Sequence, residues 1–207
     1  MAGVSCDLVQ KEPAPRGRPR RFDAEEVRIK ARDAFWQAGY QATSLDRLSE
    51  VTGLKRPSLY GAFGDKQALY VNLLRTYRET NLASVRTVLS DTSSLRNALT
   101  AVLTGAINLY VPNGQGCFIL NTAPSEAETD VAVREELGRV TDDLDTAFGD
   151  RCARAKAEGE LGETVDPRAR GRLATAVLHS LSIRARGGEP RAALEHLART
   201  GVDLLLS

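Results

Sequence analysis

Four side chains that can hydrogen-bond to nucleic-acid bases or phosphates lie within six residues of one another: Lys55, Arg56, Ser58 and Tyr60. Arginine and lysine donate to guanine edges and to phosphate oxygens, serine pairs with several base edges, and tyrosine reaches phosphates. These groups can act on one partner only if a single rigid element presents them side by side. The first turns of one helix would do this.

The surrounding sequence predicts three helices, over residues 23–39, 43–53 and 55–64. Apolar residues recur at helix-face spacing in each range, and a glycine ends each one. Thr43 followed three residues later by Asp46 is a capping-box pattern, which predicts that Thr43 opens the second helix. Two short helices joined by a glycine-containing turn are typical of a helix-turn-helix, whose second helix enters the DNA major groove.

The charge of the chain is almost balanced overall but differs between its two parts. The 28 Lys+Arg and 27 Asp+Glu give a formal +1, yet residues 1–66 hold 12 basic and 9 acidic residues, whereas residues 67–207 hold 16 and 18. The positive charge gathers in the Pro/Gly/Arg-rich run 13–21, which cannot form a helix. Residues 1–21 are therefore predicted to be a flexible basic arm, which either contacts DNA or is a solvated linker.

The rest of the chain is also helical in pattern, so the predicted fold class is all-α. A long helix is expected to follow Asp65, which can cap it. Further helices are predicted over residues 94–111, 116–123, 131–158, 166–186 and 191–206.

The run from Phe22 to Leu74 resembles the N-terminal domain of the tetracycline-repressor (TetR) family of transcription regulators. The matching segments, in order and at the family spacing, are 34–35, 39–40, 43–44, 48–51, 53–54, 58–60, 63 and 65–69. The resemblance implies an N-terminal three-helix helix-turn-helix domain followed by a larger C-terminal helical domain. It divides the chain into the arm at 1–21, a DNA-binding domain at 22–66, and an effector-binding and dimerisation domain at 67–207.

The resemblance also implies which residues contact DNA. The arginines of the arm would reach phosphates or the minor groove, the second helix would hold a phosphate at its start, and the fourth helix would clamp the backbone. For Thr43 and Tyr60 the plainer alternatives are a helix cap and packing against the core. The implied contact residues are Arg18, Arg20, Arg21, Thr43, Lys55, Arg56, Ser58, Tyr60 and Lys66.

Apolar stripes on the last two predicted helices correspond to the four-helix dimer interface of the family. Two DNA-binding domains related by a two-fold axis would bind a palindromic operator. The alternative is that the stripes close the core of a monomer. The stripe residues are Leu173, Val177, Leu178, Leu181, Leu194, Leu197, Val202 and Leu205.

A small-molecule effector would bind among the helices of the C-terminal domain, although apolar residues at helical spacing are more often ordinary core. The implied partners are thus double-stranded operator DNA, a second copy of the chain and an effector, with no membrane. The candidate lining residues are Tyr77, Leu103, Ile107, Tyr110, Phe118, Asn121, Phe148 and His179.

Three cysteines, Cys6, Cys117 and Cys152, are too few and too scattered for a disulfide framework, which indicates a reduced, cytoplasmic chain. Cys117 follows a glycine at the start of a predicted helix, in a Gly-Cys segment that is common in the family. Its ordinary role is that of a small buried hydrophobe. The alternative is a thiolate, activated by the helix N-terminus, that senses electrophiles or oxidants.

An enzyme is the competing class, but the sequence contains no phosphate-binding loop, no G-x-S-x-G and no H-E-x-x-H. His179 and His196 are 17 residues apart with no metal-ligand spacing around them, so no metal and no cofactor are expected. The sequence therefore predicts a ligand-responsive transcription regulator, a repressor that binds a palindromic operator as a dimer and is released by an effector. A thiol-sensing repressor that uses Cys117 is the alternative, and an all-α enzyme is the remote one.

Overall fold

The computed structural model describes residues 22–90, 94–112 and 114–207, and within these ranges the chain is helical and contains no strand. The predicted all-α class is confirmed. The elements are α1 (Ala24–Ala38), α2 (Leu45–Thr52), α3 (Arg56–Phe63), α4 (Lys66–Ser90), α5 (Leu95–Tyr110), α6 (Phe118–Thr122), the 3₁₀ turn η1 (Glu126–Glu128), α7 (Val131–Ala157), α8 (Pro167–Arg186) and α9 (Arg191–Leu206).

Short polar side chains and glycines define where the first helices begin and end. The Asp23 carboxylate accepts from the Glu25 backbone N–H at 2.8 Å and so caps α1. Ser44 rather than Thr43 caps α2, because its Oγ accepts from the Arg47 N–H at 3.1 Å. Gly53 then ends α2 with φ near 70°, a left-handed conformation that costs glycine little and turns the chain into α3.

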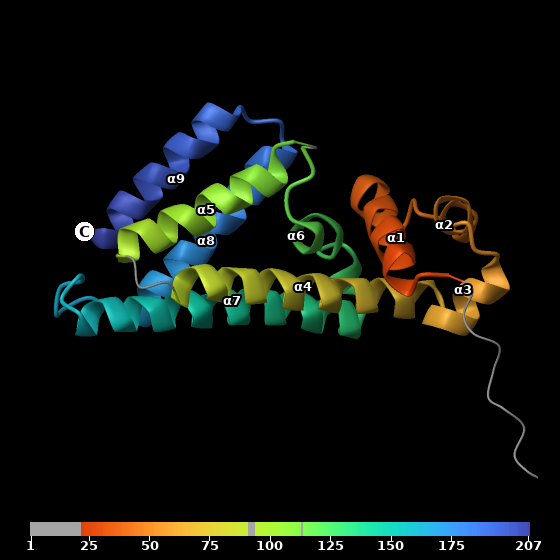
Figure 1. Ribbon diagram of the computed structural model, residues 1–207, viewed down its shortest axis with the longest axis horizontal. Helices are drawn as coiled ribbons and strands as arrows, with labels where there is room; N and C mark the ends of the chain where they lie inside the picture. The colour runs from red at the N-terminus through yellow and green to blue at the C-terminus, as the bar shows by residue number, and fades with distance from the viewer. Residues whose placement is uncertain (1–21, 91–93, 113) are drawn as a thin grey trace, which may run out of the picture.

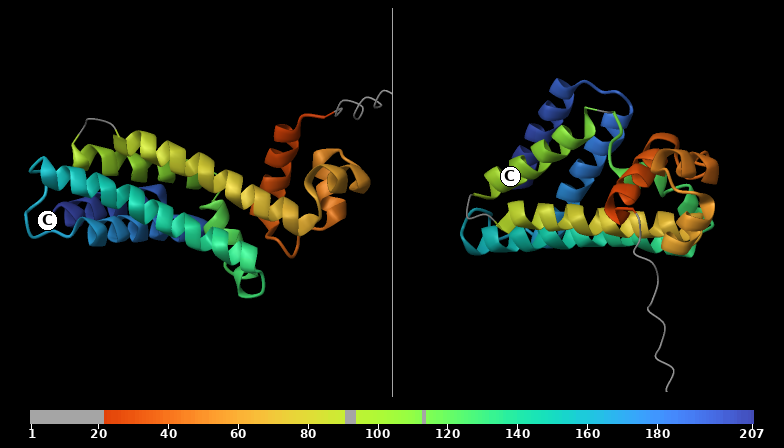
Figure 2. Two further views of the ribbon diagram at one scale, coloured as in Figure 1. Left: turned by 90° about the horizontal axis from the view of Figure 1, so that it is seen from below. Right: turned by 45° about the vertical axis from the view of Figure 1, so that its right-hand side comes forward.

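Two long helices, α4 and α7, lie side by side along the length of the molecule (Figures 1 and 2). Helices α1, α2 and α3 gather at one end, around the start of α4. Helices α5, α8 and α9 pack together over the other end, and the short α6 lies between the two groups. Because α4 contacts α1 and α3 at its start and α5 and α7 further along, it connects the two ends as one continuous helix.

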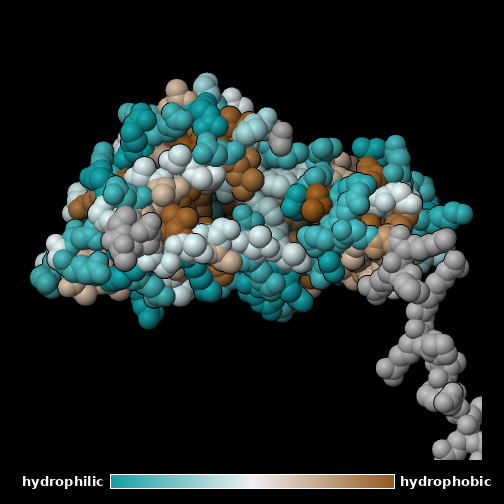
Figure 3. Space-filling model, in the orientation of Figure 1, coloured by the Kyte–Doolittle hydropathy of each residue, from teal (hydrophilic) through white to brown (hydrophobic). Residues whose placement is uncertain are grey.

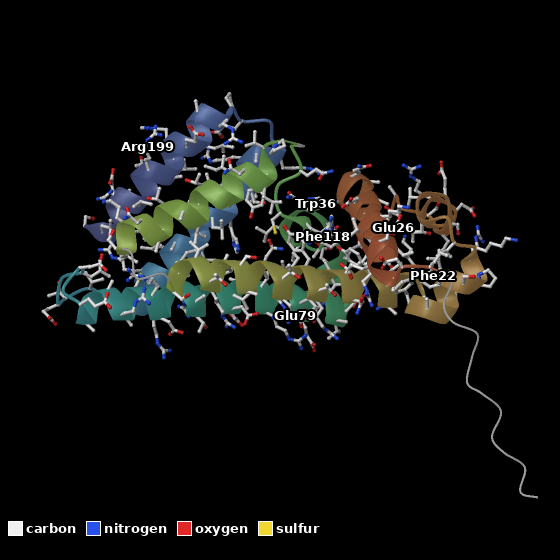
Figure 4. The ribbon with its side chains drawn as sticks, viewed as in Figure 1. Phe22, Glu26, Trp36, Glu79, Phe118 and Arg199 are labelled. Atoms are coloured by element: carbon white, nitrogen blue, oxygen red, sulfur yellow. The ribbon has the colours of Figure 1, made fainter. Side chains whose placement is uncertain are left out.

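An aromatic cluster joins the helix-turn-helix end to the rest of the core. Phe35 of α1 packs against Tyr70 of α4 with ring centroids 5.1 Å apart, and Phe118 of α6 packs against both Tyr70 and Trp36. Trp36 and Phe118 meet between α1 and α6 in Figure 4. The Tyr70 hydroxyl also donates to Thr122 Oγ1 at 2.7 Å. The two ends are therefore packed against each other rather than joined by a loose linker.

A buried carboxylate ties α4 to α7. Glu136 of α7 is fully buried, and its two oxygens accept from Arg75 Nε and Arg78 Nε of α4 at 3.1 Å each. Arg139 donates to the same carboxylate at 2.7 Å. Burial alone would raise the pKa of Glu136, but the hydrogen bonds and charges of Arg75 and Arg78 outweigh it and leave the pKa below its ordinary value. The carboxylate is therefore ionised in the folded chain.

Candidate nucleic-acid interface and ligand cavity

The exposed surface of α3 and of the turn before it carries the four side chains that the sequence marked as DNA contacts. Lys55, Arg56 and Ser58 are exposed, and Tyr60 is 45% exposed, whereas Leu59 between them is buried at 3%. One helix face thus packs against the core and the opposite face is free. We call Lys55, Arg56, Ser58 and Tyr60 the reading face.

The N-terminus of α3 is left open toward solvent on the reading face. Lys55 occupies the N-cap position and makes no side-chain cap hydrogen bond. Pro57 follows in the first turn, where its missing N–H costs nothing. The Ser58 N–H donates to the Lys55 carbonyl at 2.9 Å, so the Arg56 N–H and the Lys55 ammonium are the groups here that favour an anion such as a phosphate.

Arg56 is held by the carboxylate of Asp46, the acidic residue of the predicted capping-box pattern. Asp46 Oδ1, in the first turn of α2, accepts from Arg56 Nε at 3.0 Å and from Arg56 Nη2 at 2.5 Å. The hydrogen bond and the charge of Asp46 raise the pKa of Arg56. A pair ten residues apart with opposite charges at two helix starts is a sequence signal that could have found this contact.

Thr43 is placed where it cannot hold a phosphate, which corrects that prediction. It is fully buried, and its hydroxyl donates to the Gly39 carbonyl at 2.7 Å and to the Ala34 carbonyl at 3.4 Å. The shorter of these bonds satisfies the carbonyl of Gly39, the C-cap residue of α1, which lies beyond the hydrogen-bonded turns of the helix. The exposed Ser44 beside it takes the capping position instead.

The Lys66 side chain is half-buried and lies over the ring of Tyr40, in the connection between α1 and α2. Its ammonium lies 4.2 Å from the centroid of the Tyr40 ring, and burial lowers its pKa while the charge of Glu126 raises it less. The predicted clamp on the DNA backbone would require this side chain to leave Tyr40.

The predicted DNA contacts of the N-terminal arm lie outside the described residues. They are Arg18, Arg20 and Arg21. Cys6 lies outside the described residues as well.

Two side-chain hydrogen bonds connect the first part of the chain to η1 and to Asp130, the N-cap residue of α7. Gln41 donates to Glu126 Oε2 at 2.7 Å, and Gln67 donates to Asp130 Oδ2 at 2.6 Å. Sequence reasoning missed both, since the partners are 85 and 63 residues apart along the chain. A movement of α4 relative to α7 would strain the contact between Gln67 and Asp130.

A cavity of about 250 Å³ lies between α4, α5, α7 and α8. In Figure 3 apolar side chains lie beside a hollow between α4 and α5. Its wall is mostly apolar, and polar groups come from Tyr77, Asn81, Tyr110 and the ion pair of Arg78 with Asp143. The lining also includes Leu82, Val85, Val88, Val102, Gly105, Leu109, Cys117, Val140, Leu144 and Leu178.

Two of the eight predicted lining residues, Tyr77 and Tyr110, line this cavity. Asn121 instead holds the chain before α6, donating to the Gln115 and Cys117 carbonyls at 2.9 and 2.8 Å. His179 is half-buried outside the cavity, and burial lowers its pKa. The other four are fully buried core residues, and large apolar side chains are usually buried in this way. They are Leu103, Ile107, Phe118 and Phe148.

Three ionisable groups in the cavity wall, those of Tyr77, Tyr110 and Cys117, are neutral. Burial raises the pKa of Tyr77, of Tyr110 and of the Cys117 thiol. Cys117 is 7% exposed, and the backbone N–H groups at the start of α6 do not offset its desolvation. The Cys117 thiol is therefore protonated, contrary to the activated thiolate that its position at a helix start suggested. Cys152 is also buried, and burial raises its pKa to about 11.

The apolar stripes on α8 and α9 divide into an inner and an outer set. Leu178, Leu181, Leu194, Val202 and Leu205 are between 0% and 5% exposed, so they close the core of the chain itself and cannot face a partner. This corrects their prediction as interface residues. Leu173 is 53% exposed, and Val177 and Leu197 are half-buried.

A second face of the same two helices is free and carries apolar and small side chains at helical spacing. Helices α8 and α9 approach closely here, because a Cβ on Gly201 would lie 3.0 Å from Val177 Cγ1. We call this surface the α8/α9 face. It comprises Leu173, Ala176, Val177, Ser180, Ile183, Ala193, Leu197, Thr200 and Leu204.

Comparison with known proteins agrees with this geometry. A family model described as bacterial regulatory proteins of the tetR family matches residues 30–73. The chain is 32% identical over 153 residues to YezE of Bacillus subtilis, named as an uncharacterized HTH-type transcriptional regulator, with 72% of this chain and 79% of that protein covered. It is 28% identical over 207 residues to the HTH-type transcriptional repressor ComR of Escherichia coli, with 99% and 97% covered.

Among solved structures, a cysteine-substituted TetR family regulator, CifR, complexed with 26-bp double-strand operator DNA superposes with a TM-score of 0.81. It is 29% identical in sequence, with 90% of this chain and 98% of that chain covered. Fold, reading face and relatives together define a DNA-binding transcriptional regulator built on a helix-turn-helix, and not an enzyme. The chain belongs to the TetR family.

Within the described ranges no helix is long and apolar enough to cross a membrane. The same residues contain no group of three or more His, Cys, Asp or Glu side chains that could hold a metal ion.

Proposed function

We propose that this regulator is a dimeric repressor that binds a palindromic operator and is released by a small-molecule effector. The observation that carries the proposal is the position of α4, which is one wall of the cavity and also packs against the reading-face helix α3. A ligand that changes the position of α4 therefore has a direct mechanical route to the DNA-binding end. By linkage, the effector must bind the DNA-incompetent state more tightly.

The proposal keeps the division of the chain into an arm at 1–21, a DNA-binding unit at 22–66 and an effector and dimer unit at 67–207. Dimerisation through the α8/α9 face would relate two reading faces by a two-fold axis. Each subunit would then read one half of an inverted repeat. DNA and the regulator would meet in the cytoplasm, where a bacterial chromosome lies.

The charge balance of the cavity favours a neutral effector. Its charged wall groups, Arg78 and Asp143, are paired with each other, and Arg78 is paired with Glu136 as well. A carboxylate ligand would lose its hydration on entering the cavity and would find no unpaired cation in the wall to bind. About 250 Å³ lies just below the usual range for ligand sites, so a molecule of about one or two fused or linked rings is expected.

DNA binding can be tested by fluorescence anisotropy with the intergenic DNA upstream of the gene, across a series of salt concentrations. Arg56→Ala is expected to weaken the free energy of operator binding by about 1 to 3 kcal/mol and to relax the base preference at one operator position. Lys66→Ala is expected to weaken binding to all sequences and to lower the salt slope by about one. Operator binding by both variants at wild-type strength would refute the assignment of the DNA-binding surface.

The cavity can be tested with a matched pair of fluorescent probes, neutral N-phenyl-1-naphthylamine and anionic 1-anilinonaphthalene-8-sulfonate. The neutral probe is expected to bind at least about tenfold more tightly, because the sulfonate finds no free cation in the wall. Gly105→Leu should abolish binding, since a Cβ at Gly105 on α5 meets open space within the cavity lining. Gly138→Leu, on the exposed side of α7, is the control and should bind like wild type.

A further inference from the structure

Asp46 is an exposed carboxylate beside a surface that is otherwise suited to a polyanion. Its side chain is 77% exposed, and that of its partner Arg56 is 52% exposed. An ion pair this exposed adds little to the stability of a fold. A negative charge next to the reading face also repels phosphate and lowers general DNA affinity. Its place in the first turn of α2 suits a negative charge, but this does not explain its contact with Arg56, which has to be considered directly.

The carboxylate occupies one defined edge of the arginine side chain. A guanidinium is a planar fork with five N–H donors, and Asp46 Oδ1 accepts from Nε and Nη2 on one side of that fork. The other edge, formed by Nη1 and the outer hydrogen of Nη2, is not engaged by any described residue of the chain. That free edge has the donor geometry that pairs with O6 and N7 of guanine.

We propose that Asp46 is a positioning residue for base readout, which fixes the Arg56 guanidinium so that its free edge meets one guanine in each half of the operator. The proposal rests on the proposed DNA-reading role of α3. Asp46 does not itself touch the base. It acts by restricting the rotamers of a long, flexible side chain before DNA arrives.

This restriction improves discrimination more than affinity. A freely rotating arginine can turn to a phosphate or to another acceptor when guanine is replaced, so a wrong base costs little. An arginine held on its Nε edge cannot turn to another acceptor. Its remaining donors are then left without partners when the wrong base is present. The two anchors are well placed for this role, because Asp46 and Arg56 lie in the first turns of α2 and α3, which the Gly53 turn holds together.

The test measures base preference, which a merely structural ion pair would not change. Wild-type protein first selects its operator from a random 30-bp duplex library, and Arg56→Ala then identifies the base pair that Arg56 reads. All four base pairs at that position are compared for wild type, Asp46→Asn and the control Glu50→Gln. Glu50 is a matched control because it is an exposed α2 carboxylate, 2.9 Å from Arg47, outside the reading face.

Asp46→Asn is expected to lose about tenfold in discrimination at the Arg56 position, toward the level of Arg56→Ala, while its affinity for non-operator DNA stays equal or rises. Glu50→Gln is expected to keep wild-type discrimination. Full discrimination by Asp46→Asn would overturn the proposal, and so would a loss confined to a different base pair, which would mean that Asp46 contacts a base itself. If Arg56→Ala alters no base preference, the reading role of α3 fails as well, and this outcome is distinguishable from the others.

Discussion

Leu204→Ala tests whether the α8/α9 face holds the dimer together. Leu204 lies on α9 and is 64% exposed in the single chain. Complete burial of a leucine side chain is worth about 2 kcal/mol, so about 1.3 kcal/mol remains to be gained by covering Leu204. A two-fold interface uses each residue twice, which makes the expected loss about 2.6 kcal/mol per dimer. The dimer dissociation constant should therefore rise by roughly 80-fold.

Sedimentation velocity over a concentration series measures this constant directly. Leu109→Ala is the control, because Leu109 on α5 is 45% exposed but lies outside the α8/α9 face. Both variants should keep the wild-type helical content by circular dichroism, since exposed positions contribute little to the core. An unchanged dissociation constant for Leu204→Ala, or a larger effect from Leu109→Ala, would refute the assignment of this surface as the interface.

Three further predictions concern the interior of the chain. Glu136→Gln should destabilise by about 3 kcal/mol at pH 7, measured by urea unfolding, because it leaves Arg78 less well paired. Folding lowers the pKa of Glu136, so its carboxylate contributes fully to the free energy of unfolding above about pH 4.3, the pKa in the unfolded chain. This contribution is lost as the pH falls through the pKa in the folded chain. The free energies of unfolding of wild type and variant should therefore converge in acid. Gly116→Ala should cost at least about 2 kcal/mol, because its φ is 62° and a Cβ would lie 2.4 Å from the Asn121 amide nitrogen and 2.5 Å from the Ser182 carbonyl oxygen. Gly188→Ala, with φ 79° and open space around it, should cost about 1 kcal/mol, and equal losses would contradict the packing argument. Thr43→Val should lower stability by about 1 kcal/mol without changing the operator affinity of the folded protein, and the reverse result would restore the phosphate contact.

The helices could be predicted from the sequence because local chemistry determines where they begin and end. Asp23 and Ser94 cap the helices that follow them, and Gly53 and Gly64 end the two short ones. The reading face was predictable for a related reason. Leu59 must point inward, so its neighbours on the other side of an eight-residue helix must point outward.

The partners of each apolar or polar side chain could not be predicted in the same way. A stripe of leucines shows that a helix has a buried side, but Leu181 and Leu173 on α8 have the same chemistry and opposite surroundings. Thr43 and Ser44 were both able to cap α2, and the carbonyls at the end of α1 decided between them. The cavity depends on where α4, α5, α7 and α8 fail to fill space, which is a property of their packing rather than of any one segment.

The ion pairs of Glu136 also fix a point near the middle of α4, about which that helix would turn if it moved. Arg75 and Arg78 reach the same carboxylate from successive turns of α4, so α4 is tied to α7 at this height and resists sliding along it. About 18 Å of helix separates Arg78 from Lys66 at the DNA-binding end, and about 15 Å separates it from Val88 at the cavity. Under the proposed function, an effector that displaced α4 at the cavity would tilt the helix about this point, and the start of α4 beside the reading face would move in the opposite direction. In a two-fold dimer, the spacing between the two reading faces would change by twice that amount.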